Sequence, residues 1–403
     1  MGRIVKVGLI LLVLVLAGAG WYVWRLMPKF PARPFTDLGP WPVATREFDW
    51  TDSARAEPFT RNPADRRRLT VQVWYPTIAG ATGDTAPYLL RPDEFADRFG
   101  AKAARKPRTN SIYEGPIAAG DSAFPVLVYH HGGLWTRWSA TFVTEWLASH
   151  GYVVFSVEHF GFNQTAAYAD GAPYQADTLL FPGETGNGRA DALASWAYLD
   201  NVVFGVWEAD GRFVLDRIAA LDAAGPFAGR LDLDRIGMLG WSFGGAVSIQ
   251  LSATDSRVKA AVDHDGQLFG SVRETGTTRP VLQFHHGYDD ALDYPEKDRA
   301  TVRELIAMTE AADSQTRARS AGPWYEIVVA GTEHLDFSDL ALFYPRKPER
   351  IEPHRGHELI RNYTLQFFDH YLRGRPAPLL APGAPPPAEL TIRTARVPAD
   401  STA

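Results

Sequence analysis

The chain contains no cysteine among its 403 residues, and this absence removes several kinds of chemistry at once. Without a thiol the protein forms no disulfide, uses no thiolate nucleophile and builds no cysteine-based zinc site. A chain without cysteine tolerates oxidising and reducing compartments alike, so the absence leaves its location open. Any nucleophile must therefore come from another type of side chain.

Long basic runs are also missing. Lysine and arginine number 41 against 47 aspartates and glutamates, which gives a formal net charge of −6. A surplus of negative charge argues against a nucleic-acid partner, because nucleic-acid binding depends on neutralising phosphates. The hydrophobic content of 45% supports a packed core, and the length fits one large α/β domain with additional segments.

One long uncharged stretch lies near the N-terminus, at residues 7–24, with basic residues on both sides. Its 18 residues are just enough for a transmembrane helix, and Trp21, Tyr22 and Trp24 would fit an interfacial aromatic belt. The alternative is a cleaved signal peptide with small residues at 17–19. We expect residues 1–27 to be an anchor or signal peptide. The folded domain would then lie outside the cytoplasm, on the periplasmic side if anchored, or secreted if cleaved.

The ends of the folded domain are marked by proline. Residues 28–45 carry five prolines and predict a stiff linker, whereas residues 376–403 are rich in proline and alanine and predict a disordered tail. The domain itself is expected over residues 46–375. Within it, residues 160–191 are rich in Gly, Ala, Asn and Asp and show little periodicity. This segment is interpreted as a possible lid insertion, with an ordinary surface loop as the alternative.

Short apolar runs recur through this domain and are separated by helical patterns. Such alternation predicts an α/β fold with a mostly parallel central sheet flanked by helices. A closing helix is expected over residues 356–372, ended by Gly374. The predicted strands are residues 70–76, 126–129, 152–157, 235–239, 258–262, 281–284 and 325–329.

The pentapeptide Gly240-Trp241-Ser242-Phe243-Gly244 lies between a predicted strand and a predicted helix. The G-x-S-x-G pattern in this setting is typical of a nucleophile elbow, a tight turn that exposes the serine hydroxyl at the top of a sheet. The pattern alone also fits a plain glycine-rich turn. We expect Ser242 to be a catalytic nucleophile.

A serine nucleophile needs a base and an acid that orients it. Hydrolases with such an elbow place them in the order Ser, Asp or Glu, then His. His334 follows the last predicted strand and is the expected base. The acid has two main candidates, Asp265 and Asp290, each after one of the next two strands, and Asp263 is a weaker third. The pattern alone does not separate Asp265 from Asp290.

The oxyanion of an acyl-transfer intermediate needs two backbone N–H donors. Phe243, directly after the nucleophile, should supply one, and Gly133 in the His130-His131-Gly132-Gly133 loop should supply the other. The paired histidines have no metal-like spacing and no carboxylate cluster accompanies them. We therefore expect neither a metal nor a cofactor.

These residues together resemble the platelet-activating-factor acetylhydrolase family, in its plasma and type II branch, which has the α/β-hydrolase fold. The resemblance covers about residues 70–372. It is sharpest from His131-Gly132 to Val157-Glu158-His159. Two further matching segments are the elbow, where Trp241 replaces a histidine, and Gly331–Asp339. In that family the acid follows the strand after the elbow, so the resemblance favours Asp265 over Asp290.

The resemblance implies a serine carboxylic-ester hydrolase that cleaves short-acyl phospholipid-like or other lipid esters through an acyl-enzyme on Ser242. A general carboxylesterase or cutinase-like polyester hydrolase is an alternative. A non-enzymatic alternative is a membrane-tethered binding protein on a hydrolase scaffold. The expected partners are an ester substrate and a membrane, bound through the N-terminal helix.

Overall fold

The computed structural model describes residues 29–35, 37–91, 105–119, 122–162, 167–174, 188–293, 295–296, 298–344 and 349–397. The predicted anchor at residues 7–24 lies outside these residues. So does part of the possible lid insertion, at residues 163–166 and 175–187. Within the described residues, no helix is long and apolar enough to cross a membrane.

A single mixed sheet organises the described part of the chain, in the order β11-β10-β9-β8-β7-β5-β6-β2-β1-β4-β3. Strands β10, β9, β8, β7, β5 and β6 pair in parallel, and β2, β1 and β11 extend the sheet by antiparallel pairing. The strands are β1 Val43–Ala56, β2 Arg66–Pro76, β3 Thr85–Pro87, β4 Arg108–Tyr113, β5 Phe124–His130, β6 Val153–Glu158, β7 Leu231–Trp241, β8 Val258–His264, β9 Val281–His286, β10 Trp324–Val329 and β11 Leu390–Ala395.

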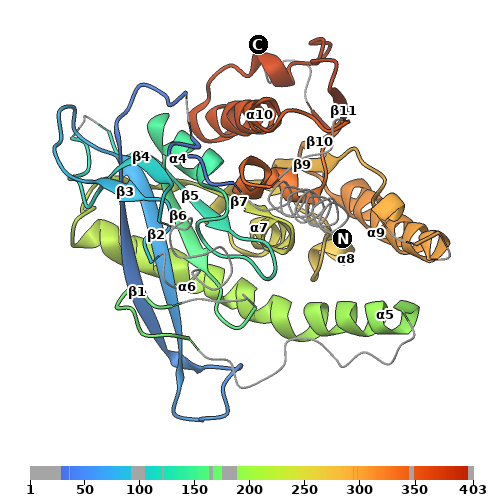
Figure 1. Ribbon diagram of the computed structural model, residues 1–403, viewed down its shortest axis with the longest axis horizontal. Coiled ribbons are helices and arrows are strands. Elements are labelled where there is room, and N and C mark those ends of the chain that lie inside the picture. The colour runs from blue at the N-terminus through green and yellow to red at the C-terminus, as the bar shows by residue number, and fades with distance from the viewer. Residues whose placement is uncertain are drawn as a thin grey trace, which may run out of the picture.

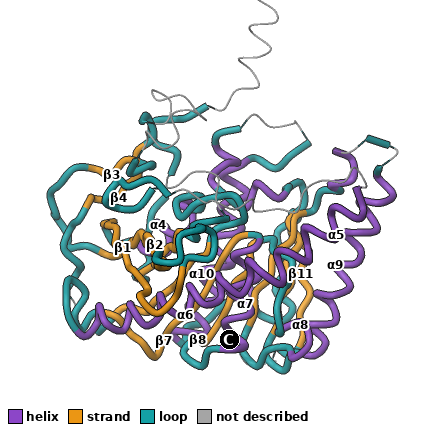
Figure 2. Tube along the Cα trace, turned by 90° about the horizontal axis from the view of Figure 1, so that it is seen from below, coloured by secondary structure: helices purple, strands orange, loops and turns teal. Residues whose placement is uncertain are grey.

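Helices cover both faces of this sheet, as Figure 1 shows with α10 on one side and α6 on the other. Seen from below, α5 and α9 lie together at one end of the molecule (Figure 2), and residues of both line one cavity. The helices are α4 Thr141–Ser149, α5 Gly188–Tyr198, α6 Phe204–Ala223, α7 Phe243–Thr254, α8 Val272–Thr275, α9 Arg299–Arg319 and α10 Pro353–Arg373.

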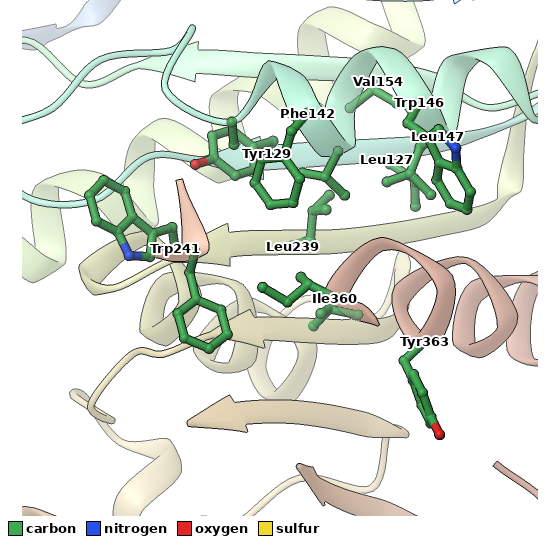
Figure 3. Close-up of a cluster of buried hydrophobic side chains, with 14 of the residues drawn as sticks. Leu127, Tyr129, Phe142, Trp146, Leu147, Val154, Leu239, Trp241, Ile360 and Tyr363 are labelled. Atoms are coloured by element: carbon green, nitrogen blue, oxygen red, sulfur yellow. The ribbon is translucent and has the colours of Figure 1, made fainter. Parts of the chain in front are cut away.

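The two faces of β5 explain why its sequence is apolar from Phe124 to Tyr129. Leu127 and Tyr129 pack in a cluster with α4 and α10, whereas Val126 and Val128 pack in a second cluster with α6 and α7. A strand covered on both faces has no solvent side and so shows no polar alternation. Figure 3 shows the first cluster, in which sheet residues Leu127, Tyr129 and Leu239 lie between α4 and Ile360 of α10.

The closing helix α10 matches the expectation closely. Pro353 occupies its first turn, where no backbone donor is needed, and the Glu352 side chain accepts from the Arg355 N–H. Gly374 ends it in the left-handed conformation, with φ of 65°. Its buried stripe includes Leu359, Ile360 and Phe367, which hold the helix against the sheet.

Both terminal segments differ from the expectation. The linker is packed on the domain: Phe30 and Phe35 are buried, and β1 begins at Val43 within the segment expected to be a linker. The tail is not disordered where it is described, because β11 pairs with β10 through six residues at the edge of the sheet. Apolar side chains in each segment, such as Phe30 and Leu390, join the core and offset the entropy of ordering the chain.

Candidate active site

Ser242 occupies a tight turn between β7 and α7. Its backbone has φ of 57° and ψ of −126°, a conformation that costs a non-glycine residue about 1–3 kcal/mol. Backbone hydrogen bonds hold the turn, from Ser242 N–H to His264 O at 2.9 Å and from Gly245 N–H to Ser242 O at 2.9 Å. The segment is therefore a nucleophile elbow.

The two outer glycines of the pentapeptide are required by space. A Cβ at Gly240 would lie 2.3 Å from the carbonyl of Gly244, and one at Gly244 would lie 2.1 Å from the carbonyl oxygen of His130. Neither backbone neighbour can move without opening the turn. The close approach also brings the elbow against the loop that follows β5.

His334 and Asp265 complete a hydrogen-bonded chain with Ser242. The His334 Nε2 lies 2.9 Å from the Ser242 Oγ, and the His334 Nδ1 lies 2.6 Å from the Asp265 Oδ2. An ionised carboxylate only accepts, so the proton of His334 is on Nδ1 and Nε2 is free to accept from the serine hydroxyl. This is the arrangement of a nucleophile, a base and an orienting acid.

Asp265 is buried at the end of β8, in the left-handed region with φ of 63°. Burial alone would raise the pKa of this carboxyl. The charge and hydrogen bonds of His286, and then those of His334, outweigh burial and hold the pKa below its ordinary value. The group is therefore ionised wherever a histidine base can work.

Of the other candidate acids, Asp263 makes different contacts. Asp263 accepts from the Gly266 N–H at 2.8 Å and from Gln283 at 3.3 Å, which points it beneath the elbow. Burial raises the pKa of Asp263 well above its ordinary value, and the nearby Asp313 adds to the rise. Asp290 begins a 3₁₀ turn, Asp290–Asp293, after β9. The His334 Nδ1 is hydrogen-bonded to Asp265.

Gly133 and Phe243, the expected oxyanion donors, line one cavity with Ser242 and His334. The cavity measures about 360 Å³, and its apolar walls come from Leu134, Phe162, Leu199, Phe243 and Phe269. Phe243 is the first residue of α7, so its amide is one of the unpaired donors at a helix N-terminus. A Cβ at Gly133 would lie 2.4 Å from the Phe162 ring, so a larger residue there would displace that wall.

The start of the possible lid insertion reaches this cavity. Phe162 packs edge-on against Phe243 with ring centroids 5.4 Å apart. Leu199, which lines the same cavity, lies beyond the insertion and follows directly after α5. The tryptophans beside the glycine loop do not line it: Trp138 is buried in the core and Trp135 packs near Trp241. A lid function for residues 160–191 stays a prediction.

Trp241, which the resemblance places where the family has histidine, has a direct contact with the loop that carries His334. Its fully buried indole donates from Nε1 to the backbone oxygen of His334 at 3.1 Å. The ring also packs on Gly132, where a Cβ would lie 2.9 Å from it. Trp241 therefore links the His334 loop to the glycine loop, a contact that the sequence pattern did not reveal.

A second residue that sequence reasoning missed is His286, at the end of β9. Its Nδ1 lies 2.7 Å from the Asp265 Oδ2 and 2.9 Å from Oδ1, and its backbone N–H donates to Oδ1 at 2.8 Å. Strands β8 and β9 are parallel neighbours, so their carboxyl ends meet. The His-His pair at the end of β9 was the available signal.

The ligand atoms of Asp265, His286 and His334 lie within 4.8 Å of one another, which raises the question of a metal. Zinc bonds of about 2.0–2.1 Å at a tetrahedral centre separate two ligand atoms by about 3.3 Å. Both Nδ1 atoms lie closer to the carboxylate, at 2.6 and 2.7 Å. These are hydrogen-bond distances, so the three side chains form a hydrogen-bonded cluster.

A further set of histidines lies beneath the glycine loop. His159 Nδ1 donates to Asp210 at 3.0 Å, and its Nε2 lies 2.9 Å from the His130 Nδ1. Arg67 forms a bidentate pair with Asp210, with contacts of 2.6 and 3.0 Å. All four side chains are fully buried. The cluster joins β2, β5, α6 and the end of β6 below the glycine loop.

Comparisons with known proteins agree with this architecture. Residues 125–314, just under half of the chain, match the Dienelactone hydrolase family. A ferulic acid esterase from Streptomyces cinnamoneus superposes with a TM-score of 0.68 and 26% identity, covering 89% of this chain and 98% of that one.

Two curated relatives match a shorter part. A probable 1-alkyl-2-acetylglycerophosphocholine esterase of Arthroderma benhamiae is 29% identical over 178 residues, and a platelet-activating factor acetylhydrolase of Canis lupus familiaris is 28% identical over 187. The matches cover 41% and 40% of this chain, and 40% and 38% of those relatives. The chain has the α/β-hydrolase fold, and its central part is similar to the Dienelactone hydrolase family.

Proposed function

We propose that this protein is a serine esterase that cleaves short-acyl lipid-like esters through an acyl-enzyme on Ser242. The observation that carries the proposal is the chain of hydrogen bonds from Ser242 through His334 to Asp265, beside a cavity lined by both expected oxyanion donors. The similarity to esterases and acetylhydrolases supports the reaction class.

In the proposed reaction, His334 removes the hydroxyl proton as Ser242 attacks the ester carbonyl. Asp265 keeps the imidazole in the required tautomer and stabilises its cation. The backbone amides of Phe243 and Gly133 stabilise the oxyanion, and loss of one such donor costs about 10²–10³ in kcat. The alcohol leaves with the proton from His334, and water then releases the acyl group by the same steps.

The cavity supports an apolar and compact acyl group. Three phenylalanine rings, Phe162, Phe243 and Phe269, enclose the side next to the nucleophile, and the volume is about 360 Å³. A site of this size takes a small ligand whose main contacts are apolar. The two acetylhydrolase-type relatives agree with a short-acyl phospholipid-like substrate.

A second candidate is an aryl-ester substrate. It is favoured by the ferulic acid esterase, whose similarity covers nearly the whole of both chains, and by the aromatic walls, which suit a planar ring. General carboxylesterase and polyester hydrolase activities use the same chemistry and belong to the same test.

The test is a substrate panel measured with the purified protein and with Ser242→Ala. It compares nitrophenyl esters of rising acyl length, short-acyl and long-acyl phospholipids, a hydroxycinnamate ester and polyester film. The proposal expects the highest kcat/KM on the short-acyl lipid esters. A clear preference for the hydroxycinnamate ester would favour the second candidate. Equal hydrolysis by Ser242→Ala, or no hydrolysis of any ester, would reject the serine esterase and leave a binding protein.

Membrane attachment through residues 7–24 is part of the proposal and rests on the sequence. Repeating the panel with the full chain and with a chain that lacks residues 1–27, on esters presented in vesicles, measures what the segment contributes. We expect faster hydrolysis of vesicle-bound substrate by the full chain and equal rates on a water-soluble ester. Recovery of the full chain from the soluble fraction of cells would contradict the anchor.

A further inference from the structure

The catalytic acid is contacted by two imidazole rings, and only one of them belongs to the base. The His334 Nδ1 lies 2.6 Å from the Asp265 Oδ2, while His286 contacts both carboxylate oxygens through its ring and Oδ1 through its backbone. An orienting acid needs a partner for the oxygen that the base does not use, because an unpaired buried oxygen is costly. In this protein the His286 ring, together with the His286 backbone N–H, is the partner of that oxygen.

His286 is well placed to fix the carboxylate. It ends β9, whose backbone is paired on both sides, and its own N–H is bound to the carboxylate, so strand and ring hold the same group. Asp265 itself is held by its N–H to the Phe284 oxygen at 3.1 Å, in a left-handed conformation. The rotation of the carboxylate is thus determined by β9 as well as by His334.

The second donor also divides the charge of the acid. Each additional hydrogen bond to a carboxylate partly neutralises its negative charge. The carboxylate then stabilises the protonated form of the base less strongly. We propose that His286 is a positioning residue for the proposed esterase: it orients the Asp265 carboxylate towards His334 and limits how strongly that carboxylate holds the His334 cation. The inference rests on the proposed function.

Other charged groups surround His286 and have to be kept constant in any test. The His334 ring lies 6.5 Å away between centroids, and His285, Tyr288 and Asp289 flank His286 along the chain. The cavity that His286 lines is about 780 Å³ and also contains these charged residues from α9, β10 and β11: Arg303, Glu310, Asp313, Arg317, Glu326 and Arg393. Variants confined to position 286 leave this background unchanged.

The test compares His286→Leu with His286→Asn in the full chain, through the pH dependence of kcat/KM on a nitrophenyl ester. Leucine removes the ring donor at similar size, whereas the asparagine amide can donate from about the position of Nδ1. For His286→Leu we expect a fall of about tenfold in kcat/KM at the optimum, because the acid loses its fixed orientation. We also expect the acidic limb to move to higher pH by about half a pH unit or more, because the undivided charge favours the His334 cation.

His286→Asn is expected to restore most of the rate and to return the acidic limb to the wild-type position. His285→Leu, the same change one residue earlier, is the control for disturbance of β9 and should leave the limb in place. If His286→Leu fails to fold, His286→Gln replaces it, because its amide reaches beyond the Nδ1 position.

The inference is overturned if His286→Leu matches the wild type in rate and profile, or if His286→Asn deviates as far as His286→Leu. Failure of the proposed function gives a different result. In that case the wild type lacks esterase activity, or Ser242→Ala retains it, whatever residue occupies position 286.

Discussion

Two histidine clusters, each built on a buried aspartate, lie on either side of the glycine loop. In one, Asp265 contacts His334 and His286 and opens onto the cavity that contains Ser242. In the other, Asp210 contacts His159, which contacts His130, and every one of these side chains is sealed from solvent. The same residue types therefore form one cluster that opens onto a cavity and one that is closed to solvent.

Burial makes the difference between them. In the sealed cluster, burial lowers the pKa of His159 to about 3 and that of His130 well below its ordinary value, so both rings stay neutral. Arg67 offsets the charge of Asp210. In the open cluster, the side chain of His334 is 40% exposed and Ser242 is within reach. A histidine acts as a base where its cation can be formed, and it supports the fold where it cannot.

The sealed cluster still serves the site, through the backbone. The His159 N–H donates to the His131 Nε2 at 3.0 Å, and the His131 Nδ1 donates to the Gly132 oxygen at 2.7 Å. These bonds fix the loop that carries Gly133. We therefore propose that the open cluster is catalytic and that the sealed one supports the loop, and the following changes test this difference.

The largest expected effect is that of Asp265→Asn, which keeps the shape of the open cluster but donates to His334 in place of accepting. The base is then held in the wrong tautomer, and kcat should fall by about 10⁴. The measurement is kcat on a nitrophenyl ester, with the thermal midpoint as the control for folding. A loss below tenfold would show that Asp265 is not the orienting acid, and Asp290→Asn would then be the next variant to measure.

The matching change in the sealed cluster is Asp210→Asn. It removes the main counter-charge of the buried Arg67, which keeps a second ion pair with the buried Glu57 at 3.0 Å. The loss of unfolding free energy should therefore stay below about 3–5 kcal/mol, which is the cost of a fully unpaired buried charge. Urea unfolding monitored by tryptophan fluorescence measures this loss. The kcat of the folded fraction should change far less than in Asp265→Asn. Full stability together with lost activity would reverse the roles assigned to the two clusters.

A smaller effect is expected from Trp241→Phe, at the contact between the two regions. The change keeps an aromatic ring against Gly132 but removes the N–H that holds the His334 oxygen, a bond that contributes about 1 kcal/mol. We expect a fall in kcat of severalfold with little change in KM. An unchanged kcat would mean that the His334 loop is held by its other contacts, including the capping bonds between Glu333 and Asp336.

The sequence predicted the parts of the fold that are covered on both faces. Each of the six parallel strands contains a short apolar run, and each predicted run overlaps an observed strand. Strand β1 was missed because its second half is polar and exposed, and β11 because it follows a proline-rich segment and lies at the edge. Such strands depend on pairing with a neighbour, which a single sequence does not display.

The candidate site divides in the same way. Ser242 and His334 have local signals, since the turn and the order of strands determine where they lie. Asp265 and Asp290 could not be separated by pattern, because both end strands at the same edge of the sheet. Trp241 and Asp210 had no signal of their own, and His286 had only the His285-His286 pair at the end of β9. Their roles depend on which residue of another element lies opposite, and that is set by tertiary packing.

The activation of Ser242 as a nucleophile can be tested directly by covalent labelling with a fluorophosphonate ester, followed by intact-mass and peptide analysis. We expect one adduct per chain, located on Ser242 and absent from Ser242→Ala, with slow labelling of His334→Ala. A wild-type protein that forms no adduct at Ser242, or labels equally fast without His334, would contradict it.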